Sequence, residues 1–301
     1  MRMLRDALVV ASFDLGESLR SRKVLVFLVL YVVGAIASAV MFTQVLRTVE
    51  EELAAQLLVA RTDRPGSLTQ AVMESGELHR VLSRLIRDRD LAATLVAVPP
   101  IALLYGWVAL TFGPVFVVLT SSDAVSSELA TGSARFALVR TDRAAWALGK
   151  LLGQSALLAV GIALGAIAAW ITGYLRLASF PPLDTALWMV RYAATSFCYA
   201  FAFLGMAVGV SQLTRSVAWS RALGLLAFTA FAAVSGIVAD DDVRPYAPVL
   251  CDSIGVFFPG GHRLDLWRPA PRDFLPSVVL LFALGVGYFA LGHVRFARRD
   301  A

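Results

Sequence analysis

The side chains best suited to chemistry gather in one polar stretch, residues 121–150, which interrupts an otherwise apolar sequence. The stretch contains no histidine or cysteine, and it offers neither a metal-ligand set nor a nucleophile pair. Scattered charges without such pairs favour contact with another protein over catalysis. The charged and turn-forming residues in question are Asp123, Glu128, Gly132, Arg135, Arg140, Arg143 and Lys150.

The rest of the sequence lacks the motifs of common catalytic sites. The Gly149-Lys150 pair has neither the upstream glycine nor the following hydroxyl of a GxxxxGK[ST] phosphate loop. No HExxH or GxSxG motif occurs, and the apolar segments hold no paired acids for a proton relay. Cys198 and Cys251 encode neither a disulfide framework nor a thiolate metal site. We therefore expect no catalytic residue, metal or cofactor in this chain.

Composition predicts an all-α membrane protein with a single transmembrane domain over residues 1–301. Apolar residues make up 58% of the chain, charged residues 16%, and the mean hydropathy is +0.72. A bilayer core requires about 20 apolar residues per helix, and lipid leaves helices as the way to satisfy the backbone. Six segments meet that length: 24–42, 95–119, 151–172, 187–210, 222–239 and 277–294.

The distribution of basic residues predicts that both ends of the chain are cytoplasmic. Both lysines and about half of the arginines fall in segments that this topology places inside, as the positive-inside rule expects. The net charge of +5 indicates no nucleic-acid partner, because the basic residues cluster at span ends.

Residues 1–19 predict an amphipathic helix in the inner membrane interface. Spacings of three and four residues place one apolar stripe on such a helix. Its members are Leu4, Leu8, Ala11, Leu15 and Leu19.

Residues 43–92, between the first two spans, predict an extracytoplasmic helical hairpin with a turn at 63–66. Each helix carries an apolar stripe that the other helix, a second copy, lipid or an extracytoplasmic partner must cover. We assign the partner-facing positions to Leu53, Leu57, Leu78, Leu82 and Leu85.

Arg191 is the only arginine or lysine inside an apolar segment. It could contact a substrate, or it could reach back to the outer interface beside Trp188 and Tyr192. In the third outer loop, residues 240–242 are three aspartates, which could hold a cation or cap a helix starting near Val243. Residues 246–258 are apolar enough to dip into the outer leaflet.

Within the polar stretch the sequence predicts a short helix held between two spans. Asp123 and Glu128 close the preceding helix, Gly132 breaks it, residues 134–139 form a short helix, and Thr141 or Asp142 caps the next one.

This stretch resembles the first cytoplasmic loop of ABC-2 type ABC transporter permeases. The matching positions are Asp123, Glu128, Gly132 with Ser133, Arg143, and Gly149 with Lys150. The family usually has proline in the turn before that arginine, where this chain has residues 140–142, Arg-Thr-Asp.

The resemblance implies a permease subunit of the bacterial inner membrane, with an N-terminal elbow helix and a re-entrant segment between spans 5 and 6. It also implies a homodimer whose loops, residues 120–150, dock on a separate cytoplasmic ATPase that binds ATP and Mg²⁺. Glu128, Arg135, Arg140 and Arg143 would then contact the ATPase, with Asp123 and Lys150 orienting the loop.

Two functions fit this architecture. The subunit could export a hydrophobic or amphipathic substrate through the dimer, as its weakly charged spans favour. Alternatively, it could transmit ATPase motion through the outer hairpin to an extracytoplasmic machine, with little substrate crossing.

Overall fold

The computed structural model describes residues 2–57, 65, 91, 94–240 and 245–298, with the side chains of 53–57 left out. The described residues form helices and no strand, and six helices are long and apolar enough to cross a membrane. This confirms the predicted all-α class with six spans. The six are α2 (Arg22–Leu57), α6 (Pro100–Ser121), α9 (Arg143–Arg176), α10 (Pro182–Ser211), α11 (Val217–Val238) and α13 (Pro271–Ala297).

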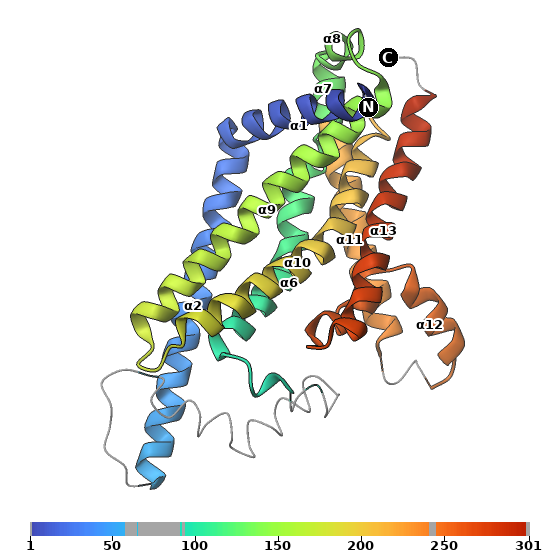
Figure 1. Ribbon diagram of the computed structural model, residues 1–301. Coiled ribbons are helices and arrows are strands. Elements are labelled where there is room, and N and C mark those ends of the chain that lie inside the picture. Colours follow the sequence, from blue (N-terminus) through green and yellow to red (C-terminus); the bar gives the residue numbers. More distant parts are fainter. Residues whose placement is uncertain (1, 58–64, 66–90, 92–93, 241–244, 299–301) are drawn as a thin grey trace.

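The first of these helices is much longer than a bilayer requires. The 36 residues of α2 extend over about 54 Å, against a hydrocarbon core of about 30 Å. Figure 1 shows α2 running past the ends of its neighbours. The predicted start of the second span at Leu95 is wrong, since α6 begins at Pro100. Proline lacks an amide hydrogen and is well suited to the first turn of a helix.

The centre of the bundle is formed by α6, α9 and α10, with α13 against α10. Its largest fully buried side chains include Tyr105, Trp146 and Tyr192. Glycines let α10 and α13 touch backbone to backbone: a Cβ atom on Gly205 would lie 1.9 Å from the carbonyl oxygen of Gly285. Small residues allow this close approach between membrane helices, where packing replaces the hydrophobic effect.

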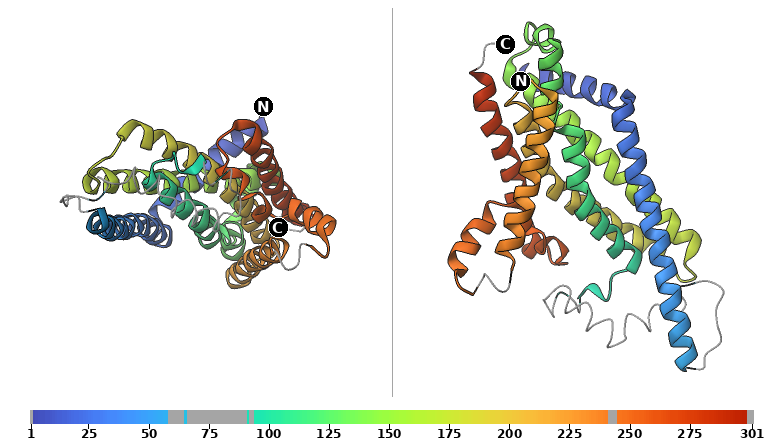
Figure 2. Two further views of the ribbon diagram at one scale, coloured as in Figure 1. Left: turned by 90° about the horizontal axis from the view of Figure 1, so that it is seen from below. Right: turned by 180° about the vertical axis from the view of Figure 1, so that it is seen from behind.

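Helix α1 (Arg2–Arg20) lies across one end of the bundle and packs mainly on α9. Figures 1 and 2 show the chain turning sharply from α1 into α2, with the start of α1 and the end of α13 near the end of the bundle that carries α7 and α8. Leu4 and Leu8 of the predicted apolar stripe are exposed, whereas Ala7 and Asp14 are buried. The face of α1 against the protein therefore carries Ala7 and Asp14 together with the partly buried Val10 and Leu15, while Leu4 and Leu8 remain exposed.

The opposite end of the bundle carries the segment between α11 and α13, made of α12 (Pro248–Val256), η1 (Pro259–His262) and η2 (Asp265–Trp267) (Figure 1). Tyr246 and Val249 are 90% and 78% exposed, so this segment presents apolar side chains outward. Its entry into a leaflet stays a prediction. Asp241, Asp242 and the predicted helix start at Val243 lie outside the described residues.

Most of the predicted outer hairpin also lies outside the described residues. Its first part continues α2, while Leu53 and Leu57 have no described side chains and Leu78, Leu82 and Leu85 lie in the undescribed range. Pro65, in the predicted turn, is described, and its carbonyl oxygen accepts a hydrogen bond from the amide of Ala178 at 2.7 Å.

Candidate functional site

The polar stretch folds into two short helices that join α6 to α9. Helix α7 spans Ser126–Thr131 and α8 spans Ala134–Leu138. Gly132 separates them with a φ of 77°, in the left-handed region that glycine adopts without strain. The predicted break and short helix are therefore present. Glu128 lies in the first turn of α7 instead of ending the span, because α6 already stops at Ser121.

The start of α9 also matches the prediction in position. Asp142 is the N-cap residue, with an extended backbone that ends the connection from α8. Its side chain makes no capping hydrogen bond, so the turn is set by its backbone instead.

Lys150 is the best-buried charge of the stretch, with a side chain that is 5% exposed. Its Nζ lies 2.6 Å from Oδ1 of Asp14 and also contacts Oε1 of Glu128. It lies 5.9 Å from the centre of the Trp146 ring. One ammonium group thus links α1, α7 and α9. Removing one partner of a buried ion pair typically costs about 3–5 kcal/mol, because a charge is left uncompensated.

Gln154, one turn further along α9, extends this link into the bundle. Its Nε2 donates to Oδ2 of Asp14 at 2.7 Å and to Oγ of Ser18 at 3.2 Å. Its Oε1 accepts from Oγ of Ser121, at the end of α6, at 2.9 Å. We call Asp14, Glu128, Lys150 and Gln154 the lysine cluster.

Two glycines of α9 make the lysine cluster possible. A Cβ atom on Gly153 would lie 2.6 Å from Oδ2 of Asp14, and one on Gly149 would lie 2.5 Å from Cβ of Val10. Any larger residue at either position would push α1 away from α9. The Gly149-Lys150 pair therefore combines close helix packing with the buried charge.

Asp123 links two further helices through ion pairs. Oδ1 accepts from Nζ of Lys23 at 2.7 Å, and Oδ2 accepts from Nε and Nη2 of Arg221 at 2.9 and 2.6 Å. Lys23 lies in the first turn of α2, and Arg221 lies in the first turns of α11. One carboxylate thus joins the first turns of two spans, α2 and α11.

Serine side chains fasten the backbone beside Asp123. Oγ of Ser211, at the end of α10, accepts from the amides of Val125 and Ser126 at 3.0 Å each. The hydroxyl of Ser220 donates to the carbonyl of Ser122. The N-terminal amides of a helix have no partner within the helix, so Ser211 satisfies donors of α7 that would otherwise be buried and unpaired.

The far end of the stretch is exposed. Phe136 and Val139 are 81% and 86% exposed, and Arg135 and Arg140 are exposed beside them. We call these four residues the α8 tip; Figure 1 shows α8 beyond the end of the bundle. Arg143 instead turns back to the bundle, where Nη1 donates to the carbonyl of Ala297 at 3.1 Å.

The seven residues singled out in the sequence therefore fall into separate environments. Asp123, Glu128 and Lys150 form internal ion pairs, Gly132 makes the bend, and Arg135 and Arg140 face outward. Sequence reasoning missed Asp14, Gln154, Lys23 and Arg221. A usable signal existed for one pair, because Lys150 and Gln154 are four residues apart and share one face of an apolar helix.

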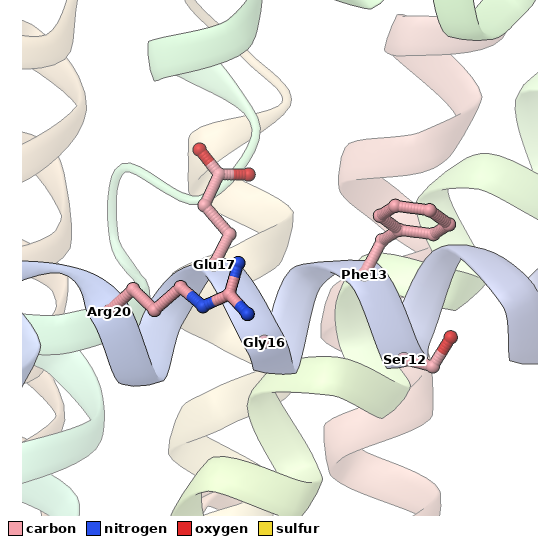
Figure 3. Close-up of a pocket in the computed structure, with 5 residues that line it drawn as sticks. All are labelled: Ser12, Phe13, Gly16, Glu17 and Arg20. Atoms are coloured by element: carbon pink, nitrogen blue, oxygen red, sulfur yellow. The ribbon is translucent and has the colours of Figure 1, made fainter.

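The outward face of α1 forms a shallow hollow of about 430 Å³ at the same end of the molecule. It is lined by Ser12, Phe13, Gly16, Glu17 and Arg20. Figure 3 shows Phe13 and Glu17 projecting from α1, and Phe13 is 77% exposed. All five residues of this face are exposed, whereas Asp14 on the same helix is buried.

A family model described as ABC-2 family transporter protein matches residues 8–245. The match begins in α1, takes in both short helices and the lysine cluster, and ends before α12. No curated protein matches the chain.

Proposed function

The chain belongs to the ABC-2 family of transporter proteins and is a membrane subunit of an ABC transporter, and from this we propose that it dimerises and couples to a separate cytoplasmic ATPase to export a hydrophobic or amphipathic substrate. ATP and Mg²⁺ would bind to the ATPase. Both chain ends and the α8 tip would face the cytoplasm of a bacterial cell.

The observation that carries this proposal is an exposed apolar tip on a rigid base. Phe136 and Val139 project into solvent, where large apolar side chains are unfavourable unless a partner covers them. Arg135 and Arg140 flank them, and arginine is common at the centres of protein interfaces. The α8 tip therefore fits an acidic-rimmed apolar groove on an ATPase.

The ion pairs that attach the polar stretch to the bundle are suited to transmitting movement from the α8 tip. A displacement of α7 would pass through Glu128 and Lys150 into α9, and through Asp14 into α1. The adjoining backbone would pass it through Asp123 into α2 and α11. Buried, hydrogen-bonded ion pairs hold their geometry closely, so movement of the loop would reach four helices together.

This assignment divides roles within the loop. Arg135, Arg140, Phe136 and Val139 would contact the ATPase, with the Phe13 face of α1 as a second contact. Asp123, Glu128 and Lys150 would hold the loop on the bundle. Arg143 would brace the start of α9 against the end of α13 through the Ala297 carbonyl.

The apolar outer faces of the bundle support a dimer. Along α11 only Ser220 and Gly224 are buried, and much of α2 is exposed. Lipid and a second copy of the chain would share these faces, with the substrate path between the two copies. The described spans lack paired acids, which favours a substrate of low polarity.

The test is the double variant Phe136→Ala/Val139→Ala, with Tyr246→Ala/Val249→Ala as a control of matched exposure at the opposite end. We expect the tip variant to lose the ATPase on co-purification from membranes and to lose stimulation of ATP hydrolysis, while its thermal stability stays unchanged. The control should retain both. Normal ATPase retention by the tip variant would contradict the proposal.

A second function, transmission of motion to an extracytoplasmic machine, is favoured by the length of α2. About 24 Å of this helix exceeds the bilayer core, which gives it reach outside the membrane. Replacing residues 58–92 by a short linker distinguishes the two. Loss of function with intact ATPase stimulation, for a parent chain that exports no measurable substrate in vesicles, would support transmission. Substrate export that persists after the replacement would support the transporter.

A further inference from the structure

Arg191 lies in the apolar part of α10, about 14 Å along the helix from its start at Pro182. A charged side chain at such a position is costly and marks a functional site unless a partner compensates it. The sequence left two interpretations open, a ligand contact or a side chain that reaches back to the interface.

The guanidinium is held in place by aromatic rings. Its carbon lies 5.0 Å from the centre of the Trp188 ring, 6.0 Å from that of Tyr192 and 5.2 Å from that of Phe274. Nη2 donates to the carbonyl of Arg268, in the segment that precedes α13. These contacts orient the guanidinium against α10 and the outer segment, with no need for it to reach bulk water.

These contacts leave the positive charge of Arg191 without a carboxylate partner among the described residues, and most of its N–H donors without an acceptor. Among the described residues, no carboxylate lies within ion-pairing distance of Arg191, and Nε is buried without a hydrogen-bond partner. A guanidinium has five N–H donors, of which one is used here. The neighbouring acid Asp265 is already engaged by Arg268 at 3.6 Å and by the hydroxyl of Ser277 at 2.7 Å.

The surroundings of Arg191 are apolar and exposed. Leu183, Leu187 and Val190, on the turns before Arg191, are 71%, 61% and 67% exposed. Leu275, next to Phe274, is 49% exposed. The guanidinium therefore lies at the edge of an apolar face that acyl chains would cover, and not inside an enclosed path.

We propose that Arg191 binds the phosphate of an anionic phospholipid in the leaflet at the α12 end of the molecule. The free N–H groups would donate to phosphate oxygens in the forked geometry that guanidinium favours. Acyl chains would lie along Leu187 and Val190, and Trp188 and Phe274 would flank the headgroup. The bound lipid would supply the negative charge that the described residues lack.

This site requires only that α10 spans the membrane, so it is independent of the ATPase contact. The test therefore uses the full chain alone in detergent micelles, with native mass spectrometry to measure the dissociation constants of phosphatidylglycerol and phosphatidylcholine. For Arg191→Gln we expect the dissociation constant for phosphatidylglycerol to rise about tenfold, the equivalent of one charge-assisted contact, with that for phosphatidylcholine little changed.

The control is Arg272→Gln, which removes an arginine whose side chain is 89% exposed in the same outer segment. It should bind phosphatidylglycerol like the parent chain. If Arg191→Gln does not fold, Arg191→Lys provides the same comparison, because lysine keeps the charge but lacks the forked N–H donors of the guanidinium. We expect Arg191→Lys to bind phosphatidylglycerol severalfold more weakly than the parent chain.

Two results would overturn the proposal. Unchanged phosphatidylglycerol affinity in the folded Arg191 variant would leave Arg191 as a clamp on the outer segment alone. Displacement of the lipid by inorganic phosphate at equal concentration would show that the site recognises a free anion and not a lipid.

Discussion

Replacing Lys150 by methionine probes the lysine cluster most directly. Methionine keeps much of the side-chain volume but leaves the carboxylates of Asp14 and Glu128 without their shared cation. Asp14 is 6% exposed, so its charge is poorly solvated, whereas Glu128 is 22% exposed and can turn partly towards water. We therefore assign most of the loss to Asp14 and expect a stability decrease of about 3–5 kcal/mol.

Equilibrium unfolding by SDS in mixed micelles measures this loss, with Arg20→Met as a control on the exposed face of α1 that should change stability by less than about 0.5 kcal/mol. A second variant separates charge from packing: Asp14→Asn/Glu128→Gln/Lys150→Met removes all three charges. It should recover most of the stability, since neutral groups of similar shape leave no buried charge.

The triple variant should nevertheless remain poorly coupled, because the ion pairs that join α7 to α1 and α9 are gone. ATP hydrolysis by the complex with its ATPase should lose most of its dependence on substrate. A Lys150→Met chain within about 1 kcal/mol of the parent in stability, with full coupling, would refute the reasoning.

Two further predictions test the other contacts of the loop. Asp123→Asn should weaken the contacts with both Lys23 and Arg221, so spin labels at the starts of α2 and α11 should show a broader distance distribution in electron paramagnetic resonance. An unchanged distribution would contradict the role of Asp123 in joining these helices. Gly153→Val should push α1, with Asp14, away from α9 and lower stability by about 1–3 kcal/mol in SDS unfolding. Gly16→Val is the control, because no atom lies within 4 Å of a Cβ atom at that position, and it should not show this steric loss.

The spans were predictable because their signal is strong and local. Long apolar runs define α9, α10 and α13, and lipid permits no structure for them other than a helix. The start of α6 was placed too early because apolar residues continue before Pro100, whereas the helix is set by proline geometry.

The loop was predictable in outline and not in its pairing. Gly132 and the break it makes follow from backbone preference, which a sequence displays directly. The partner of Lys150 lies 136 residues away on α1 and is brought there by Gly149 and Gly153, so no local pattern identifies it. The sequence therefore led us to predict that Glu128 contacts the ATPase, while the structure places its carboxylate in an ion pair with Lys150.

The central claim is that the α8 tip binds a cytoplasmic ATPase, and site-specific photocrosslinking tests it most directly. A photoreactive amino acid would replace Phe136 in native membranes, with Tyr246 as the matched control position, and the crosslinked protein would be identified by mass spectrometry. We expect crosslinks from Phe136 to an ATPase with a phosphate-binding loop, and no crosslink to that ATPase from Tyr246. Crosslinks from Phe136 to lipid or to other proteins, with no ATPase among them, would contradict it.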